Sequence, residues 1–174
     1  MKNSVRIISG DYKGREILTP GGATHPMGER ERIALFNMIL PYIPGASVLD
    51  AYAGSGALGI EALSRGASEC VFLEKNTQAT KVISSNLREL GILERATIER
   101  GNAANFASTE PFDVIFADPP YDDFKLDEVS HLADFLVNGG IMILSHPTEV
   151  PEIKGLTLIK TRQYARAHLS VFTK

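Results

Sequence analysis

The stretch Val48-Leu49-Asp50-Ala51-Tyr52-Ala53-Gly54-Ser55-Gly56-Ala57-Leu58-Gly59 decides the fold of this chain. It starts as an apolar strand, breaks at its glycines and continues from Ile60 to Arg65 as a helix with an apolar face. Gly54 and Gly56 can adopt positive φ angles and let the backbone approach a ligand closely, which a Cβ atom would prevent. The start of the following helix offers unpaired N–H groups to that ligand. The sequence therefore predicts a nucleotide-type binding corner at this turn.

Two carboxylates distinguish between two kinds of nucleotide cofactor. The run from Gly54 to Gly59 also matches the G-x-G-x-x-G pattern of dinucleotide enzymes. Glu74 lies about 20 residues after Gly54, where either cofactor needs an acceptor for its ribose hydroxyls. Asp50, however, repels a pyrophosphate and suits S-adenosylmethionine, which carries an amino group and a sulfonium. The D-x-x-x-G-x-G corner resembles the first motif of methyltransferases that use this cofactor. We therefore favour a methyltransferase and keep a dinucleotide oxidoreductase as an alternative.

Asn102 follows the strand predicted at 96–100, at a position where methyltransferases often place an Asp that binds the adenine amino group. An Asn can accept a hydrogen bond through its oxygen or donate one to a ring nitrogen. A simple turn asparagine is the alternative. With these contacts, the predicted cofactor-binding residues are Asp50, Ala51, Tyr52, Gly54, Ser55, Gly56, Glu74, Lys75, Asn102, Ala103 and Asp118.

A second motif, Asp118-Pro119-Pro120-Tyr121, ends the apolar run 112–117. Ligands of open α/β sheets bind at the carboxyl ends of the strands near the switch point, so we expect Asp118 to face the cofactor. An ordinary turn is the alternative, because Asp-Pro pairs often open turns. The position of this motif, after a buried strand and downstream of the glycine corner, favours a functional role.

The same four residues suit methylation of an exocyclic base amine. The lone pair of such an amine is delocalised into the ring, and acceptors that bind its N–H groups can turn the lone pair towards the methyl group. Asp118 and the carbonyl between Pro119 and Pro120 can supply these acceptors, and the prolines hold the backbone rigid. Tyr121 offers a flat face on which a flipped-out base can stack. We predict Asp118, Pro119, Pro120 and Tyr121 as the catalytic residues.

Strands and helices alternate through most of the chain, which predicts a parallel sheet with helices on both faces. A helix at 29–40 comes first, with Ile33, Phe36 and Leu40 on one face, which Leu35 and Ile39 widen. Two closing runs, 157–160 and 167–172, are joined by a short link and therefore predict an antiparallel pair. The fold class is a Rossmann-like, seven-stranded, mostly parallel α/β sheet with its last strand antiparallel and an N-terminal β-hairpin. The other predicted strands are 47–50, 70–74, 96–100, 112–117 and 141–145, and the other helices are 57–65, 76–90, 103–108 and 125–137.

The composition fits one domain, spanning residues 1–174. A net charge of −3 and a pI of about 5.8 argue against a free-standing binder of naked nucleic acid. No run is long and apolar enough to cross a bilayer, and the chain opens without a secretion signal. Cys70 is the single cysteine, and neither it nor the four histidines show metal-ligand spacing. We expect a cytoplasmic monomer without a metal or a membrane partner.

Residues 1–28 form a separate N-terminal extension. Two strand-like runs, 5–8 and 15–18, flank a glycine-containing turn and predict a hairpin with a basic excess. It is either a solvated edge hairpin that caps the sheet or a basic arm that touches phosphates. Two further cations in the first turns of helix 29–40 oppose the helix dipole, which suggests another task such as meeting phosphate. Surface arginines without such a task are the alternative. The predicted RNA contacts are Arg6, Lys13, Arg15, Arg30 and Arg32.

The chain resembles the RsmD-type bacterial methyltransferases along nearly its whole length. The glycine corner and the Asp-Pro-Pro-Tyr motif occur across many amino-methyltransferases. Two narrower blocks carry the family assignment, and a closing Gln163-Tyr164 supports it. These blocks are Arg6-Ile7-Ile8-Ser9-Gly10, with Gly14-Arg15, and Ala34-Leu35-Phe36-Asn37.

This resemblance implies methylation of the exocyclic N2 of a guanine in 16S (small-subunit) ribosomal RNA. It also implies that residues 1–28 help to hold RNA and that the substrate is an assembling ribosomal particle. His25-Pro26-Met27 stands where the family usually has Arg-Pro-Thr, so Arg30 or Arg32 is the candidate substitute. The alternatives are an adenine-N6 methyltransferase on DNA or RNA and a non-catalytic RNA-binding assembly factor.

Overall fold

The structure is a computed structural model that describes residues 4–21, 27–164 and 168–174. Seven strands form one sheet in the order β5-β4-β3-β6-β7-β9-β8. All neighbouring pairs from β5 to β7 are parallel, and β9 is antiparallel to both β7 and β8. The predicted fold class is thereby confirmed. The strands are β3 (Ser47–Ala51), β4 (Glu69–Glu74), β5 (Ala96–Arg100), β6 (Phe112–Ala117), β7 (Leu136–His146), β8 (Thr157–Gln163) and β9 (His168–Thr173).

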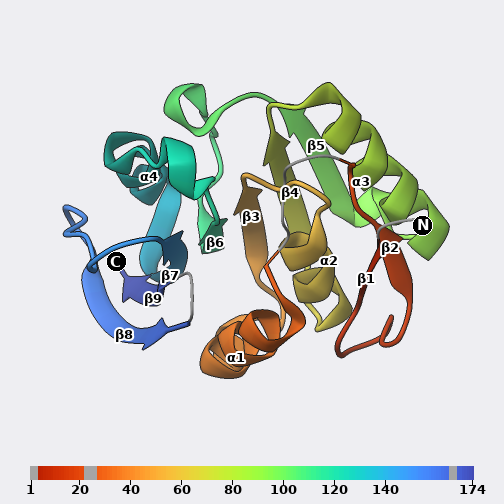
Figure 1. Ribbon diagram of the computed structural model, residues 1–174, viewed down its shortest axis with the longest axis horizontal. Helices are drawn as coiled ribbons and strands as arrows, with labels where there is room; N and C mark the ends of the chain where they lie inside the picture. Colours follow the sequence, from red (N-terminus) through yellow and green to blue (C-terminus); the bar gives the residue numbers. More distant parts are fainter. Residues whose placement is uncertain (1–3, 22–26, 165–167) are drawn as a thin grey trace.

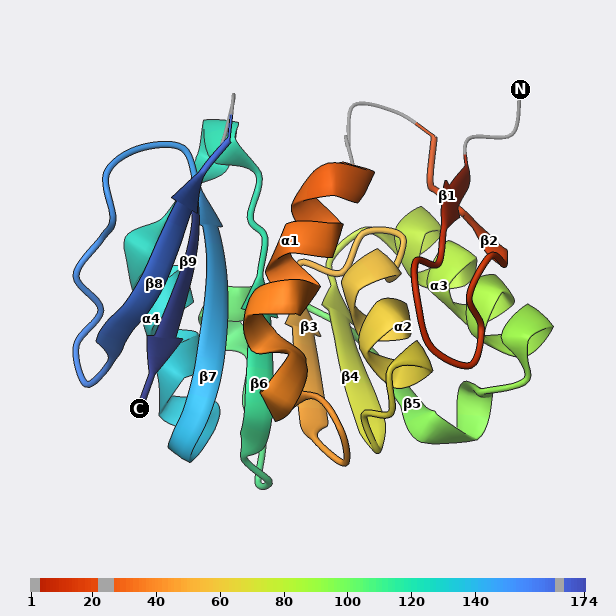
Figure 2. The same cartoon turned by 90° about the horizontal axis from the view of Figure 1, so that it is seen from below.

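Helices cover both faces of this sheet (Figures 1 and 2). On one face, α1 (Glu29–Ile39), α2 (Ala57–Ser64) and α3 (Thr77–Leu90) pack on a core that includes Val48, Phe116 and Val171. On the other face, α4 (Leu126–Leu132) packs on a second core. The third glycine of the corner explains how closely α2 approaches the sheet, since a Cβ atom on Gly59 would lie 2.4 Å from the Phe72 ring. Short 3₁₀ turns complete the chain at Leu40–Tyr42, Leu93–Arg95, Ala103–Asn105, Tyr121–Asp123 and Ala133–Phe135.

Several element predictions need correction. The helix predicted over 103–108 is only a short 3₁₀ turn, Ala103–Asn105. The helix predicted over 125–137 ends at Leu132, and β7 begins at Leu136 instead of residue 141. The early start of β7 comes with an irregular register against β6 between Phe112 and Val114. The predicted face of α1 is right for Leu35, Phe36 and Ile39, which are buried. It is wrong for Ile33, which is 37% exposed, and for Leu40, where the chain has entered a 3₁₀ turn. The helix also buries Arg32, which the apolar pattern did not include.

The N-terminal hairpin is present, but it is not attached to the main sheet. Its strands β1 (Ser4–Arg6) and β2 (Glu16–Leu18) form a separate two-stranded sheet. The hairpin lies beside α2 and α3 (Figure 2), and Leu18 exchanges hydrogen bonds with the Asn86 side chain of α3. It therefore extends the helical layer and does not cap a sheet edge. Within the described residues, no helix has the length and apolarity to span a membrane.

Candidate active site

The predicted site residues lie at the carboxyl ends of four neighbouring strands. Asp50 is in β3, Glu74 ends β4, Asn102 follows β5 and Asp118 follows β6. In the sheet, β3 and β6 are adjacent although β4 and β5 separate them in sequence, so the strand order reverses between them. This is the switch point at which open α/β sheets bind their ligands. The fold thus brings together residues that are far apart in the chain.

The glycine corner adopts the backbone that the sequence predicted. Gly54 and Gly56 have φ angles of +56° and +79°, which few other residues adopt without strain. Tyr52 has a φ of +74° and is the sole positive-φ residue other than glycine in the described ranges. The space beside Gly54 is open, since a Cβ atom there would meet nothing within 4 Å. A ligand can therefore approach this backbone directly, and the strain at Tyr52 is of the kind that collects at binding sites.

Glu74 holds this corner in place. One carboxylate oxygen accepts a hydrogen bond from the Gly54 N–H at 2.8 Å, and the other accepts from the Asn76 N–H at 2.8 Å. A carboxylate has about four acceptor positions, so Glu74 retains capacity for a ribose hydroxyl. The sequence predicted the contact with a ribose hydroxyl. The structure adds the hydrogen bond from Gly54, which ties the glycine turn to the end of β4.

Asp50 is buried, with 2% of its surface exposed, and accepts a hydrogen bond from the Gly59 N–H of α2 at 2.9 Å. Burial raises the pKa of Asp50 to about 8; the hydrogen bond from Gly59 opposes this shift, and the charges of Asp118 and Glu74 add to it. The charges of Asp118 and Glu74 at the same edge of the sheet therefore favour a cationic ligand over a pyrophosphate, which fits the amino group and sulfonium of S-adenosylmethionine. Together with the open glycine backbone, this set of residues fits that cofactor.

Other predicted cofactor contacts lie around the same edge. Asn102 caps the 3₁₀ turn that follows it, because its side-chain oxygen accepts from the Asn105 N–H at 3.0 Å. Ala103 is buried at the start of this turn, and Lys75 is exposed beyond the end of β4. The side-chain nitrogen of Asn102 can donate a hydrogen bond to a ring nitrogen of a cofactor.

The Asp-Pro-Pro-Tyr motif leaves β6 beside this corner. Pro119 is buried, Pro120 is exposed, and Asp118 and Tyr121 are partly buried. Burial raises the pKa of Asp118 to about 6, and a hydrogen bond with Ser145 opposes the shift. The Tyr121 hydroxyl lies 2.5 Å from the Ser145 hydroxyl. The motif therefore presents a hydrogen-bond acceptor, Asp118, and an aromatic ring, Tyr121, next to the glycine corner. Both residues interact with Ser145, which the sequence analysis did not single out.

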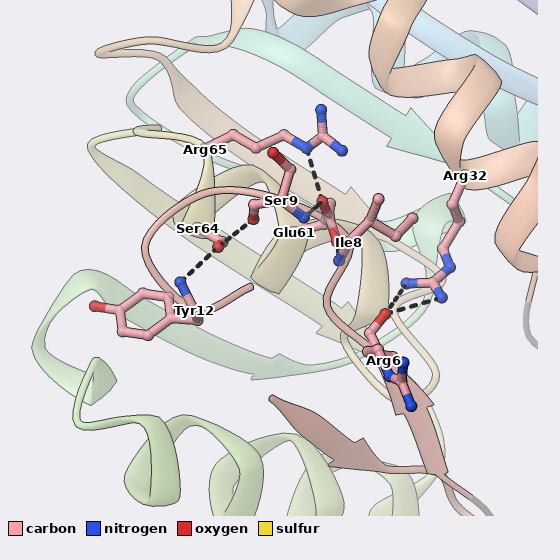
Figure 3. A network of polar contacts seen from close by, with 8 residues as sticks. All are labelled: Arg6, Ile8, Ser9, Tyr12, Arg32, Glu61, Ser64 and Arg65. Carbon is pink, nitrogen blue, oxygen red and sulfur yellow. Dashed lines mark hydrogen bonds and ion pairs between the residues drawn. The ribbon is translucent and has the colours of Figure 1, made fainter. Parts of the chain in front are cut away.

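Of the predicted RNA contacts, Arg32 needs correction. Its side chain is only 2% exposed, and both terminal nitrogens donate to the backbone carbonyl of Arg6 at 3.1 Å (Figure 3). Arg32 lies on the buried face of α1 and connects that helix to the hairpin, so its guanidinium is not available at the surface. Arg6, Lys13 and Arg30 are exposed. Arg15 is exposed as well, and its guanidinium donates to the Glu89 carbonyl. His25 and Pro26 lie outside the described residues.

Buried polar residues of α2 hold the loop between β1 and β2 against this helix (Figure 3). The carboxylate of Glu61, with 0% exposure, accepts from the N–H groups of Ile8 and Ser9 at 2.8 and 3.0 Å and from Arg65 at 2.7 Å. One turn later, Ser64 donates to the Ser9 carbonyl at 2.6 Å. This contact could not be predicted from the sequence, in which Glu61 has the pattern of an exposed helical charge.

Asn86 of α3 makes a second link between the hairpin and the cofactor corner. It exchanges hydrogen bonds with both backbone groups of Leu18 at 2.9 Å, and it donates to the Ser55 carbonyl at 3.1 Å. Asn86 is 2% exposed, although the apolar pattern of α3 did not include it. The extension and the glycine turn are therefore parts of one hydrogen-bonded assembly.

The fold and this site define a methyltransferase of the seven-stranded α/β class, and comparisons with known proteins refine the assignment. A protein of Bacillus subtilis named "Putative rRNA methyltransferase YlbH" is 36% identical over 98% of this chain and 99% of its own. "Ribosomal RNA small subunit methyltransferase D" of Haemophilus influenzae is 38% identical over 73% of this chain and 68% of its own. The solved structure "Putative methyltransferase yhhF from Escherichia coli" superposes with a TM-score of 0.90 at 29% identity, covering 99% of this chain and 98% of its own.

The model of the family described as "Conserved hypothetical protein 95" matches residues 5–173. The chain belongs to this family, the RsmD/YlbH family of S-adenosylmethionine-dependent methyltransferases.

Proposed function

We propose that this protein methylates the exocyclic N2 of a guanine in small-subunit (16S) ribosomal RNA, with S-adenosylmethionine as the methyl donor. The observation that carries the proposal is the position of Asp118-Pro119-Pro120-Tyr121 at the end of β6, next to the glycine corner of β3. Such an arrangement places the amine that receives the methyl group beside the methyl donor. The names of the relatives from Bacillus subtilis and Haemophilus influenzae support ribosomal RNA as the substrate class.

In this proposal the cofactor is held by the residues around the glycine corner. Gly54, Gly56 and the start of α2 offer backbone groups, Glu74 accepts from the ribose, and Asp50 pairs with the cationic amino group. When bound, S-adenosylmethionine supplies an electrophilic methyl group on its sulfonium. The remaining predicted contacts, which complete the site in this proposal, are Ala51, Tyr52, Ser55, Lys75, Asn102, Ala103 and Asp118.

The protein contributes mainly positioning and electrostatic stabilisation. Asp118 accepts a hydrogen bond from the guanine amine, and the carbonyl between Pro119 and Pro120 accepts a second, which directs the nitrogen lone pair towards the donor. Tyr121 stacks on the base that has left its helix. As the nitrogen forms its bond to the methyl group it becomes positive, and the Asp118 carboxylate stabilises that charge. The bond between this methyl group and the sulfonium sulfur would break as the new bond forms, which leaves a neutral thioether. The methylated amine then loses one proton to water, which restores its neutral form.

The N-terminal extension is the proposed RNA-holding element of a single methyltransferase domain. Arg6, Lys13, Arg15 and Arg30 present cations to phosphates, and the links from Glu61 and Asn86 keep the hairpin at a fixed position beside α2 and α3. The proposed substrate is an assembling ribosomal particle in the cytoplasm, and the protein binds it as a monomer. On such a particle these few exposed cations can contact phosphates although the protein has a net charge of −3.

Methyl transfer to defined substrates tests the proposal. Labelled S-adenosylmethionine is supplied with unmethylated small ribosomal subunits, naked ribosomal RNA or DNA, and the products are identified by nucleoside mass spectrometry. We expect N2-methylguanosine from the subunits. N6-methyladenine would overturn the target base, and cofactor binding without any transfer would favour the non-catalytic assembly factor.

A variant tests the role of Asp118 in the same assay. Asp118→Ala should bind S-adenosylmethionine with an affinity near that of the wild type, while methyl transfer falls by at least about a hundredfold. Full activity in this variant would rule out the mechanism proposed above.

A further inference from the structure

Ser145 contacts both ends of the Asp-Pro-Pro-Tyr motif. It lies one residue before the end of β7 and is only 2% exposed. Ala117 of β6 pairs with Leu144 of β7 in parallel register, so the next residues, Asp118 and Ser145, are neighbours at the carboxyl edge of the sheet. The Ser145 hydroxyl is 2.5 Å from the Tyr121 hydroxyl, and its hydrogen-bonding influence lowers the pKa of the neighbouring Asp118 carboxyl. One buried hydroxyl therefore connects the acceptor and the aromatic ring of the site.

The chemistry of the three groups sets the direction of these hydrogen bonds. An ionised Asp118 carboxylate can only accept, so Ser145 donates its single proton to Asp118. The Ser145 oxygen is then free to accept from the Tyr121 hydroxyl, which donates. A carboxylate that accepts from Ser145 still has acceptor positions for an amine N–H. The chain of hydrogen bonds thus fixes Asp118 and Tyr121 while leaving Asp118 able to receive a substrate.

The burial of Asp118 makes this contact important. Burial favours the neutral form of Asp118, whereas the interaction with Ser145 favours the ionised form. Burial also raises the pKa of the Tyr121 hydroxyl; the bond to Ser145 opposes that shift, and the charges of Asp118 and Glu31 of α1 add to it. Loss of the Ser145 hydroxyl would leave Asp118 with its burial and without this compensation.

We propose that Ser145 is a positioning residue, which holds the Asp118 carboxylate and the Tyr121 ring in the arrangement that receives the target base. The inference rests on the proposed function, because it assigns Asp118 and Tyr121 to the substrate amine and base. It adds a residue from β7 to a site otherwise built on β3, β4, β5 and β6. Ser145 acts through these two side chains and does not itself touch the reacting atoms.

The test compares Ser145→Ala and Ser145→Thr with the wild type in methyl transfer to small ribosomal subunits. For Ser145→Ala, we expect kcat to fall between about tenfold and a hundredfold, since misplaced groups lose the alignment of the reaction. We also expect unchanged S-adenosylmethionine affinity and a shift of the acidic limb of the kcat–pH profile to higher pH. Ser145→Thr keeps a hydroxyl and should recover most of kcat. Wild-type kcat and an unmoved acidic limb in Ser145→Ala would overturn the proposal.

Ser170→Ala is the matched control. Ser170 is a fully buried serine of β9 whose hydroxyl contacts His146 at 2.9 Å and Thr161 at 2.9 Å, away from the motif. Its loss should lower the unfolding temperature without moving the acidic limb. If the acidic limb moved equally in Ser145→Ala and Ser170→Ala, the effect of Ser145→Ala would be general destabilisation, and the proposal would be overturned.

A titration without substrate separates this inference from the proposed function. The Asp118 carboxyl carbon is followed by NMR in protein labelled with ¹³C-aspartate and is assigned with Asp118→Asn. A higher Asp118 pKa in Ser145→Ala supports the link, and an unchanged pKa overturns it. Absence of methyl transfer by the wild type would instead overturn the proposed function, while the titration would still decide the link between Ser145 and Asp118.

Discussion

Asp50 combines a role in the fold with a proposed role in cofactor binding. Its carboxylate accepts from the first turn of α2, so it fixes the helix whose N-terminus forms the glycine corner. Burial, reinforced by Asp118 and Glu74, raises its pKa to about 8, so the side chain is mostly neutral at pH 7 when no cation is bound. The sequence predicted the carboxylate and its preference for a cationic cofactor. Its depth below the surface depends on how α2 packs, which the local sequence does not encode.

This shift makes the stability of the free protein depend on pH. The folded-state pKa of Asp50 lies above the unfolded value of about 3.9, so its contribution to stability is complete below about pH 4 and is lost as the pH rises through about 8. We expect the free energy of unfolding, measured in urea, to fall by about 2 kcal/mol between pH 6 and pH 9. Asp50→Asn keeps an acceptor for Gly59 and should remove most of this dependence. An equally steep dependence in the variant would contradict the assignment to Asp50.

Residues with long-range polar contacts were the hardest to predict. Asp118 and Tyr121 could be selected because they stand next to each other in a motif that follows an apolar strand. Ser145, Glu61 and Asn86 form their contacts with residues 24 to 68 positions away. A polar residue on a strand or helix normally predicts a solvent-facing position. Their burial follows only from the tertiary arrangement.

At the scale of elements, the glycine and proline boundaries and the apolar runs were sufficient to predict the strands that build the site. The ends of β3, β4, β5 and β6 lie within a residue or so of the predicted ends, because each is a short run followed by a turn and three of them, β3, β4 and β6, are largely apolar. The buried face of α1 was predicted only in part, because Ile33 is exposed and Arg32 is buried. A charged residue, Arg32, occupies that face because the hairpin carbonyl of Arg6 satisfies two of its nitrogens. Apolar periodicity alone cannot detect such compensation.

Asn86 provides a test of how the elements are joined. Asn86→Asp keeps the shape of the side chain but replaces the amide donor, which faces the carbonyls of Leu18 and Ser55, with an oxygen. A buried polar group without its partner costs about 1–3 kcal/mol, and a charged one costs more. We expect a loss of stability of at least about 2 kcal/mol in urea unfolding at pH 7, with faster amide hydrogen exchange in β2.

The control for this variant is Asn37→Asp, which makes the same chemical change at an exposed position of α1. It should alter stability by less than about 0.5 kcal/mol. Similar losses in the two variants would mean that Asn86 does not join the hairpin to the glycine turn in solution.

At the scale of the whole molecule, charge is distributed unevenly. The chain carries a net charge of −3, the acidic groups Asp50, Glu74 and Asp118 gather at the cofactor edge, and exposed cations lie on the hairpin and at the start of α1. Overall composition therefore predicted weak binding to naked nucleic acid, whereas the structure leaves several cations of the hairpin and of α1 exposed. Arg32 is not one of these exposed cations, and its removal should reduce stability more than RNA binding, because its guanidinium holds the Arg6 carbonyl.

The salt dependence of RNA binding tests this distribution. Each cation that neutralises a phosphate contributes about one unit, or slightly less, to the slope of log K against log salt. If Lys13 meets a phosphate, Lys13→Ala should weaken binding of a small-subunit RNA fragment and reduce that slope by about one unit, measured by fluorescence anisotropy across a salt series. Lys81→Ala removes an equally exposed cation from α3 and is the matched control, with an unchanged slope expected. Equal slopes for the two variants would show that the hairpin cation contributes only to the general charge of the molecule, and the RNA-holding role of the extension would have to be abandoned.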